Sequence, residues 1–303
     1  PPWKAQSLYA SDDKYTFAVF SDLTGGDREG VFEIAVAPLN LLRPEFIVNV
    51  GDLIDGGTDP AKLNRQWDSF DARTGKARAR VFYTGGNHDL LGKEMRAVWE
   101  ERYGARYYHF VYRNVLFLVL DTEDHSPERL SEIAELRRQA LEVAAEHGWD
   151  AFEETEYARM PEDETGAISS TQSEYMVKAM ADNPDVRWTF LLMHKSPWTG
   201  GNTPNWAAIE SALGERPYTV FHGHRHAYKY GQHNGRDHIR LATTGGVQMP
   251  EHGRSMDQVM LVTVDDQGVD IANILMAGIL DKTGHVPLSG DTVCFEQALC
   301  GKD

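Results

Sequence analysis

Side chains that can bind metal ions or move protons stand directly after several short apolar segments of this chain. In each case a run rich in β-branched and aromatic residues ends at a turn, and an Asp, Asn or His follows. The residues concerned are Asp22, Asp52, Asn87, His88, Asp89, His194, His224 and His226. Carboxylates, an amide and imidazoles can ligate transition metals, and an imidazole can also transfer a proton near neutral pH. Such a set would support a metal-assisted reaction.

Alternating strand-like and helix-like segments in the first half predict the elements that position these residues. Apolar runs at 16–20, 46–50 and 81–84 are separated by helical patterns, the first of which covers 30–42 and stops before Pro44. Strands spaced by helices indicate βαβ units and a buried parallel sheet. Because the carboxyl ends of such strands meet at one crevice, we expect the polar residues that follow them to converge there.

The second half returns to sheet patterns after a charged helical stretch. Residues 107–120 predict a hairpin, and the apolar runs at 188–193 and 218–221 predict further buried strands. Residues 228–275 are typical of antiparallel strands joined by tight turns. The helical stretch, at about 126–182, is interpreted as outer packing rather than a lid, because its charges are typical of a solvated face.

One domain over residues 1–281 that carries this helical insert, followed by a C-terminal tail at 282–303, is the simplest organisation. No apolar run approaches the roughly 20 residues of a membrane-spanning helix. The cysteines, Cys294 and Cys300, are close enough for a local disulfide or are two unrelated thiols. A disulfide, together with a start that lacks methionine, favours a periplasmic or secreted protein; the other reading is cytoplasmic.

The charge balance limits the partners of the protein. There are 46 acidic and 30 basic residues among 303, which gives a formal net charge of −16. Proteins that bind nucleic acids broadly, or dock on anionic membranes, need a basic surface, so both classes are disfavoured. An acidic protein with an anionic substrate needs local positive charge, which bound metal ions could supply.

The order of the motifs is more informative than any single residue. An Asp after a strand is more often a helix cap than a ligand, and an isolated His is more often structural. The segment Gly223 to His226 is a stronger indication of a metal site, because side chains two residues apart at the end of a strand point the same way. His224 and His226 are therefore expected to reach two neighbouring metals.

The ordered set resembles the calcineurin-like metallophosphoesterase superfamily, which includes purple acid phosphatases. The family pattern is D-x-H, G-D-x-x-D, G-N-H-D/E, a single His after a later strand, and G-H-x-H. The matching segments are Asp22-Leu23-Thr24, Gly51-Asp52-Leu53-Ile54-Asp55, Gly86-Asn87-His88-Asp89, Met193-His194 and Gly223-His224-Arg225-His226. The resemblance covers roughly Phe17 to Leu275. It implies an α/β fold, a four-layer α/β/β/α sandwich of two mixed β-sheets flanked by helices.

The resemblance also implies two divalent or mixed-valence metal ions, which would be manganese, iron or zinc. The ligands carried over are Asp22, Asp52 and His226 for the first metal, and Asp52, Asn87, His194 and His224 for the second. His88, with a pKa near its ordinary value, would protonate the leaving oxygen, and Asp89 would hold its ring. Asp55 would steady a ligand, or is simply a helix-start carboxylate.

One position departs from the family pattern. The histidine of D-x-H is Thr24 here, and a hydroxyl is a much poorer ligand than an imidazole for a transition metal. The first site then has three protein ligands, and water or Thr24 itself fills the gap. We therefore expect partial occupancy of the first site.

The implied activity is hydrolysis of a phosphate mono- or diester in a small substrate by a metal-bound hydroxide. A nuclease of the same superfamily is a second hypothesis, against which the net charge counts. A non-catalytic or weakly active metal-binding protein on the same scaffold is a third. Thr24 favours this third hypothesis, whereas His88 opposes it because it has no obvious binding role. The segment 195–202 is either the pocket mouth or an ordinary surface loop.

Overall fold

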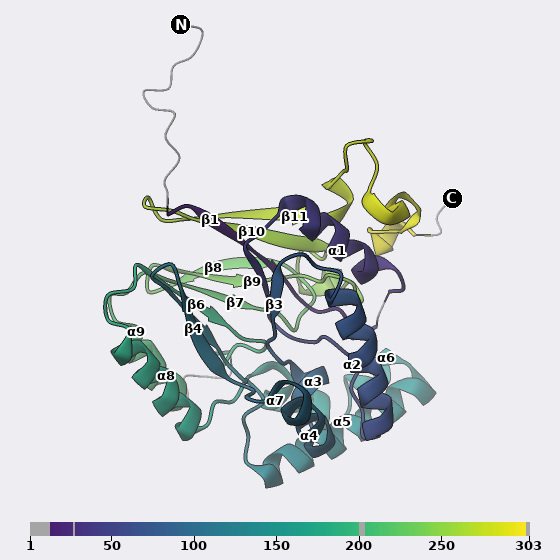
Figure 1. Cartoon of the computed structure of the whole chain (residues 1–303). Coiled ribbons are helices and arrows are strands. Elements are labelled where there is room, and N and C mark those ends of the chain that lie inside the picture. Colours follow the sequence, from purple (N-terminus) through teal and green to yellow (C-terminus); the bar gives the residue numbers. More distant parts are fainter. Residues whose placement is uncertain (1–12, 27, 200–203, 301–303) are drawn as a thin grey trace, which may run out of the picture.

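Two β-sheets packed face to face form the centre of the molecule (Figure 1). The computed structural model describes residues 13–26, 28–199 and 204–300. The first sheet has the order β11-β10-β1-β2-β3 and the second has the order β4-β5-β6-β7-β9-β8. The strands are β1 (Tyr15–Phe20), β2 (Phe46–Asn49), β3 (Arg80–Phe82), β4 (Tyr108–Tyr112), β5 (Val115–Val119), β6 (Trp188–Leu192), β7 (Tyr218–His222), β8 (Lys229–His233), β9 (Arg236–Arg240), β10 (Gln258–Val264) and β11 (Val269–Leu275).

Both sheets are mixed, with parallel strands at the centre. Strands β1, β2 and β3 run parallel, and β10 pairs antiparallel to β1 with Phe17 opposite Val262. Strands β5, β6, β7 and β9 also run parallel, while β4 and β8 are antiparallel edge strands. The carboxyl ends of the parallel strands therefore supply the loops in which the candidate site residues lie.

The core between the two sheets is rich in aromatic side chains. Phe17 and Phe46 from the first sheet meet Phe117 and Phe190 from the second, and all four are buried. Their ring centroids lie 4.9 to 5.3 Å apart across the interface, in edge-to-face contacts. Aromatic and β-branched residues favour strands and pack well on both faces of a buried sheet, which explains the continuous apolar runs in the sequence.

Helices cover the outer faces of the sheets, so the predicted four-layer sandwich is confirmed. Helices α1, α2 and α4 pack on the first sheet, whereas α8 and α9 pack on the second. The helix α1 begins after Gly30 and ends at Leu42, followed by the capping residue Arg43, which has φ of 53°, and by Pro44. The bounds of these helices are α1 (Val31–Leu42), α2 (Pro60–Thr74), α3 (Asn87–Leu90), α4 (Lys93–Tyr103), α8 (Ser170–Asp182) and α9 (Pro204–Leu213).

The insert consists of several helices between β5 and β6. It contains α5 (Pro127–His147), α6 (Trp149–Phe152), a 3₁₀ turn at Tyr157–Arg159, α7 (Pro161–Glu164) and α8. Helix α5 packs buried residues, including Leu130 and Ile133, against the cluster that also contains α2 and α4. Within the described part of the chain, no helix has the length and apolar character that a bilayer span requires.

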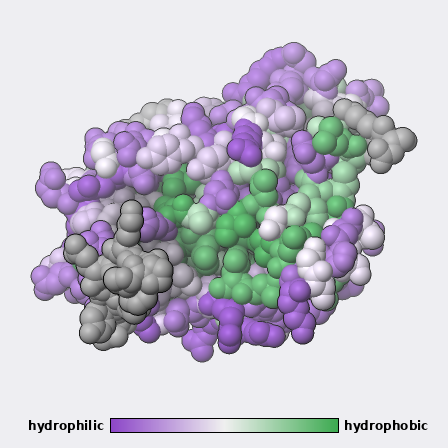
Figure 2. All heavy atoms as spheres, turned by 90° about the horizontal axis from the view of Figure 1, so that it is seen from above, coloured by the Kyte–Doolittle hydropathy of each residue, from purple (hydrophilic) through white to green (hydrophobic). Residues whose placement is uncertain are grey.

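The C-terminal segment lies against α1. Val286 and Val293 join the apolar cluster that includes Ile34 of this helix. A disulfide links Cys294 and Cys300, so the pairing alternative of the sequence analysis is the observed one. Figure 2 shows hydrophobic residues gathered on this upper side of the molecule, where Figure 1 places β10, β11 and α1. Leu275 at the end of β11 is exposed, so helices cover the outer face of the first sheet only in part.

Candidate metal centre

The predicted ligands converge at the carboxyl ends of the central strands. Asp22 follows β1, Asp52 follows β2 and Asn87 opens α3 after β3. From the second sheet, His194 follows β6, while His224 and His226 follow β7. Side chains that are up to 204 residues apart in sequence therefore meet in one crevice, as the strand-end positions predicted.

Four of these residues have an unusual backbone conformation. Asp22, Asp52, His224 and His226 have φ values of 48°, 57°, 78° and 47°, in the left-handed region that non-glycine residues seldom adopt. Such a conformation is unfavourable for each residue and is kept only where the surroundings impose it. The turns thus aim these side chains inward at a cost in backbone energy, as is common at functional sites.

Two glycines allow the loops to approach the carboxylates closely. A Cβ on Gly86 would lie 2.2 Å from Oδ1 of Asp52, and a Cβ on Gly223 would lie 2.4 Å from Oδ2 of Asp22. Any larger residue at either position would displace a candidate ligand. The glycines of the two motifs are therefore explained by the space that the carboxylates need.

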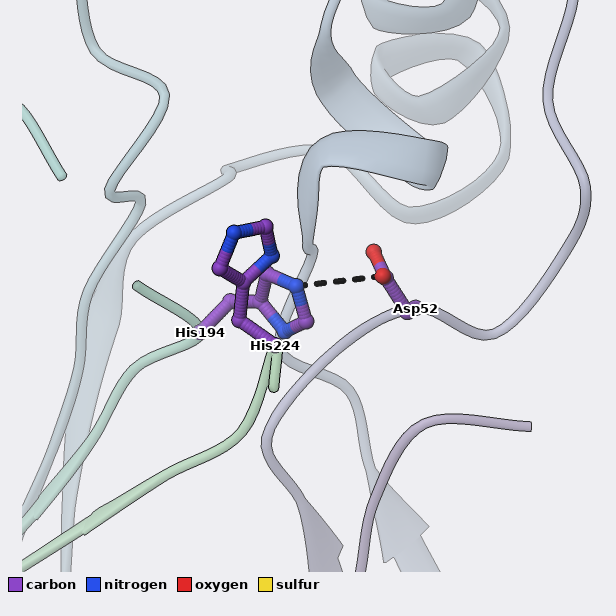
Figure 3. A group of neighbouring side chains, drawn as sticks. All are labelled: Asp52, His194 and His224. Carbon is purple, nitrogen blue, oxygen red and sulfur yellow. Dashed lines mark ion pairs between the residues drawn. The ribbon is translucent and has the colours of Figure 1, made fainter. Parts of the chain in front are cut away.

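Asp52, His194 and His224 form the first of two groups of donor atoms (Figure 3). One atom from each residue lies within 4.8 Å of the others, and Nε2 of His194 is 3.1 Å from Oδ2 of Asp52. Asn87 joins this group, because its Oδ1 is 3.0 Å from Nε2 of His194. The group coincides with the four ligands carried over for the second metal.

Asp22, Asp52 and His226 form the second group, again within 4.8 Å of one another. Nε2 of His226 lies 3.4 Å from Oδ1 of Asp22, and all three residues are buried. Asp52 belongs to both groups, which is the position that a bridging ligand requires. These are the three ligands carried over for the first metal.

Each of the three histidines uses its second ring nitrogen to contact a backbone carbonyl. Nδ1 of His194 is 2.8 Å from the oxygen of Val50, and Nδ1 of His226 is 2.6 Å from the oxygen of Val247. Nε2 of His224 is 2.6 Å from the oxygen of Asp163. A nitrogen that faces a carbonyl carries a proton, so the other nitrogen is the one that can offer a lone pair to a metal. The donor set therefore fits divalent cations in both ligand type and tautomer.

Burial and mutual charge shift the pKa values of the central groups strongly. Burial disfavours protonation of His194, but the Asp52 carboxylate outweighs it and raises the pKa of His194 to about 9. Burial acts to raise the pKa of Asp52, yet the neighbouring histidines hold it well below its usual range. Burial raises the pKa of Asp22 despite the nearby His226. Buried carboxylates and imidazoles packed this closely are typical of a functional site.

His88 lies beside these groups and not among them. Its Nδ1 is 3.1 Å from the carbonyl oxygen of Asp55, and its Nε2 is 2.8 Å from Nη2 of Arg137. Burial, opposed by Asp52 and reinforced by Arg137, lowers the pKa of His88 to about 4. The expectation of an ordinary pKa was therefore wrong. In this arrangement His88 is neutral and accepts a hydrogen bond at Nε2.

Asp89 does not hold the ring of His88, in contrast to the sequence-based expectation. Its carboxylate accepts hydrogen bonds from the backbone N–H groups of Leu53, Ile54 and Gly86 at 2.8 to 3.2 Å. Asp89 thus ties the loop that carries Asp52 to the turn that carries Asn87. Burial, with the Asp52 charge, raises the pKa of Asp89 to about 8.

Thr24 and Asp55 contact each other. The Thr24 hydroxyl donates to the Asp55 carboxylate, so this hydroxyl is already engaged. Asp55 is not a helix-start residue, because α2 begins at Pro60 and is capped by Asp59. Its carbonyl instead orients His88, which makes Asp55 a supporting residue of the site.

The helical insert reaches the site, so outer packing alone was the wrong expectation. Arg137 of α5 contacts His88, and the carbonyl of Asp163 in α7 contacts His224. Arg225, between the two histidines of the last motif, pairs with Glu164. The insert therefore supplies contacts to both sides of the candidate centre.

Lys195, the residue after His194, contacts the insert through the carbonyl of Glu162. It is 1% exposed, its Nζ is 3.0 Å from Oε1 of the buried Glu123, and it donates to the carbonyl of Glu162 at 2.8 Å. Trp198 packs against Trp206, His222 and His238. The start of the segment 195–202 is thus part of the interior, while residues 200–202 lie outside the described residues.

The model of the calcineurin-like phosphoesterase family matches residues 15–228, which is more than two thirds of the chain. The chain belongs to the calcineurin-like phosphoesterase family. Both groups of donor residues lie in the matched range, from Asp22 to His226. No curated protein matches this sequence.

Solved structures confirm the calcineurin-like fold of this phosphoesterase-family member at low identity. A Plasmodium protein described as GAP50, the anchor in the inner membrane complex, is 16% identical with a TM-score of 0.51, covering 90% of this chain and 87% of that one. The yellow lupin purple acid phosphatase PPD1 is 12% identical with a TM-score of 0.53 over 88% of this chain, which spans only 52% of the lupin chain. A structure described as PhoD is 12% identical with a TM-score of 0.51, covering 87% and 69%.

Sequence reasoning missed the contributions of the insert. The backbone carbonyls of Val50, Asp163 and Val247 leave no trace in residue type. Arg137 was visible in the sequence, because it stands four residues after Ile133 and three before Ala140, on the buried face of α5. A charged residue on the apolar side of a helix was the available signal.

Proposed function

We propose that this protein is a metal-dependent phosphoesterase that hydrolyses a phosphate mono- or diester in a small substrate. The observation that carries the proposal is the orientation of three histidines. Each has one ring nitrogen on a backbone carbonyl and directs the other toward the buried carboxylates Asp22 and Asp52. Membership of the calcineurin-like phosphoesterase family supports the same reaction class.

Two metal ions would be held by the two donor groups that share Asp52. The first would take Asp22, Asp52 and His226, and the second would take Asp52, Asn87, His194 and His224. Manganese, iron and zinc suit this mixture of imidazole, carboxylate and amide ligands. When bound, the cations would supply positive charge for the phosphoryl oxygens and lower the pKa of water toward neutrality.

His88 is the proposed proton donor to the leaving oxygen. Its Nδ1 is fixed on the Asp55 carbonyl, so Nε2 is the atom that exchanges a proton with the substrate. The ring lies beside Gly25, where a Cβ would lie 3.7 Å from Nε2 of His88 and 3.0 Å from Cε1 of His226, so the glycine lets this loop lie close to both imidazoles. A negatively charged substrate beside the ring, and departure of Arg137, would both favour the protonated form.

Thr24 makes the group of Asp22, Asp52 and His226 the weaker of the two donor groups. Its hydroxyl is engaged with Asp55, so three protein residues remain there against four in the other group. With fewer protein ligands, we expect the first metal to dissociate more readily than the second. Partial occupancy of the first site in purified protein is therefore part of the proposal.

A non-catalytic metal-binding protein is the second candidate, and the same Thr24 contact favours it. The Plasmodium structure with this fold is described as an anchor, so the scaffold also occurs in a protein named for a different role. The position of His88 next to the donor groups, where its backbone N–H donates to Oδ1 of Asp52, favours the enzyme. The disulfide between Cys294 and Cys300 supports a periplasmic or secreted location for either function.

The test is hydrolysis of nitrophenyl phosphate and bis(nitrophenyl) phosphate, with elemental analysis of the same protein samples. We expect hydrolysis of at least one ester that depends on added manganese, iron or zinc and disappears with a chelator. Metal binding without turnover of either ester would favour the non-catalytic candidate. Absence of both metal binding and turnover would reject the proposal.

A further inference from the structure

Arg137 stands on the inward side of α5, next to a residue with the opposite orientation. It lies one turn from the buried Ile133 and Ala140, is half-buried itself, and places Nη2 2.8 Å from Nε2 of His88. Arg138, which follows it, is exposed and pairs with Glu135 and Glu142. Two adjacent arginines thus differ in environment, because neighbouring positions on a helix face different directions.

The partner of Arg137 is unusual for a half-buried guanidinium. Other cations around the insert each meet a carboxylate: Lys195 meets Glu123, Arg225 meets Glu164 and Arg129 meets Glu162. Among the residues that the structure describes, no carboxylate lies within ion-pair distance of Arg137. Removing a guanidinium from water without an anionic partner is unfavourable. An anion that arrives with the substrate would remove this cost.

We propose that Arg137 binds a non-esterified oxygen of the substrate phosphoryl group and so makes phosphate monoesters the preferred substrates. This inference rests on the proposed function, because it assumes that the ester is bound at the centre beside His88. A guanidinium forms strong, directional hydrogen bonds to phosphate, stronger than those to a neutral imidazole. Arg137 would therefore leave Nε2 of His88 for the phosphate, which frees that nitrogen to face the leaving oxygen.

The preference for monoesters follows from the number of free oxygens. A monoester has three non-esterified oxygens and about two negative charges near pH 7, whereas a diester has two and one charge. With two of the free oxygens held at the metal centre, a monoester would leave a third for Arg137, whereas in a diester that third oxygen would carry a carbon substituent. Such an oxygen is uncharged and a weak acceptor, and its substituent would have to fit against α5.

Two variants of Arg137 and one control variant test the role of this residue. Arg137→Gln removes the positive charge. Arg137→Lys keeps the charge but lacks the planar, paired N–H donors of the guanidinium. Arg138→Gln is the matched control on the same helix. Binding of inorganic phosphate to manganese-loaded protein is measured by calorimetry, with equal metal content verified for each variant. We expect Arg137→Gln to weaken phosphate binding about 10- to 100-fold. Arg137→Lys should fall between Arg137→Gln and wild type, and Arg138→Gln should match wild type.

Turnover tests the substrate class. We expect kcat/KM for nitrophenyl phosphate to fall about 10- to 100-fold in Arg137→Gln, while bis(nitrophenyl) phosphate, with the same leaving group, changes less than about threefold. Equal losses on both esters, or a wild-type preference for the diester, would overturn the inference. Unchanged phosphate affinity in Arg137→Gln with normal hydrolysis would reject the role of Arg137 and leave the proposed function standing. Arg137-dependent phosphate binding without hydrolysis of any ester would reject the proposed function and leave the role of Arg137 in phosphate binding standing.

Discussion

The strand-end loops and the helical insert contribute to the same centre in different ways. The loops deliver all of the candidate ligands, from Asp22 to His226, at the ends of strands in both sheets. The insert supplies no candidate ligand, but Arg137 contacts His88 and the carbonyl of Asp163 contacts His224. The loops therefore supply the donor atoms, while the insert contacts His88 and one of the candidate ligands, His224.

This difference explains why the two regions are so unequally visible in the sequence. A ligand must have a particular side chain, so its type and spacing can be read directly. A supporting carbonyl can come from any residue, and a helix from the insert can reach the site only once the tertiary fold has formed. The following predictions separate the two contributions.

The largest effect is expected for Asp52→Ala, which removes the carboxylate shared by both donor groups. Hydrolysis and both metals should be lost together, because each group loses the carboxylate that the two share. Metal content and kcat are measured beside Asp266→Ala, a control in the exposed turn between β10 and β11. If Asp52→Ala keeps both metals and its activity, the loops do not form the proposed centre.

The next largest effect is expected for His88→Ala. The variant should keep its metals but lose about 10²- to 10⁴-fold in rate, as is typical when a general acid is removed. The loss should be greater for an alkyl phosphate than for nitrophenyl phosphate, whose leaving group departs without a proton. His147→Ala, an exposed histidine at the end of α5, is the control. Equal losses on both substrates would exclude the acid role.

Lys195→Met tests how the insert is anchored. The change leaves Glu123 buried without its partner, so we expect a loss of about 3–5 kcal/mol in the free energy of unfolding. The double variant Lys195→Met with Glu123→Leu should recover most of this loss. Lys178→Met breaks an exposed ion pair with Asp182 and should cost at most about 1 kcal/mol. Similar losses in the two single variants, measured by urea unfolding, would argue against a stabilising anchor.

The smallest effect is expected for Thr24→His, which adds an imidazole to the weaker donor group. Affinity for the first metal should rise by about tenfold, or 1.4 kcal/mol, with no change at the second site. Thr24→Val removes the hydroxyl that contacts Asp55 without adding a ligand and should not raise affinity. Metal titration followed by activity measures both. Full two-metal loading of wild type after dialysis, with no gain from Thr24→His, would contradict the assignment of a weak first site.

Much of the fold could be predicted because its strands are strongly patterned. The runs that became β1, β2 and β6, and the turn between β8 and β9, were located within a few residues. The sheet to which β10 and β11 belong could not be predicted, because no feature of the neighbouring sequence shows that β10 pairs with β1. The parallel pairing of β7 with β9 was likewise hidden, since it depends on a crossover that only the tertiary structure shows.

In the candidate site, too, some features could be predicted from the sequence and others could not. The convergence of Asp22, Asp52 and His194 followed from strand-end positions, whereas the environment of each group did not. His88 had the residue type of an acid, but its low pKa arises from burial and from Arg137, which is 49 residues away. Asp89 had the position of a ring partner, but backbone N–H groups from another loop satisfy its carboxylate.

The central claim is that two metal ions share Asp52, and anomalous diffraction from crystals soaked in manganese tests it most directly. We expect two peaks about 3.5–4 Å apart, as in two-metal phosphoesterases. One should lie among Asp52, Asn87, His194 and His224, and the other, with lower occupancy, should lie among Asp22, Asp52 and His226. A single peak that does not contact Asp52, or no peak at these residues at saturating manganese, would contradict the account.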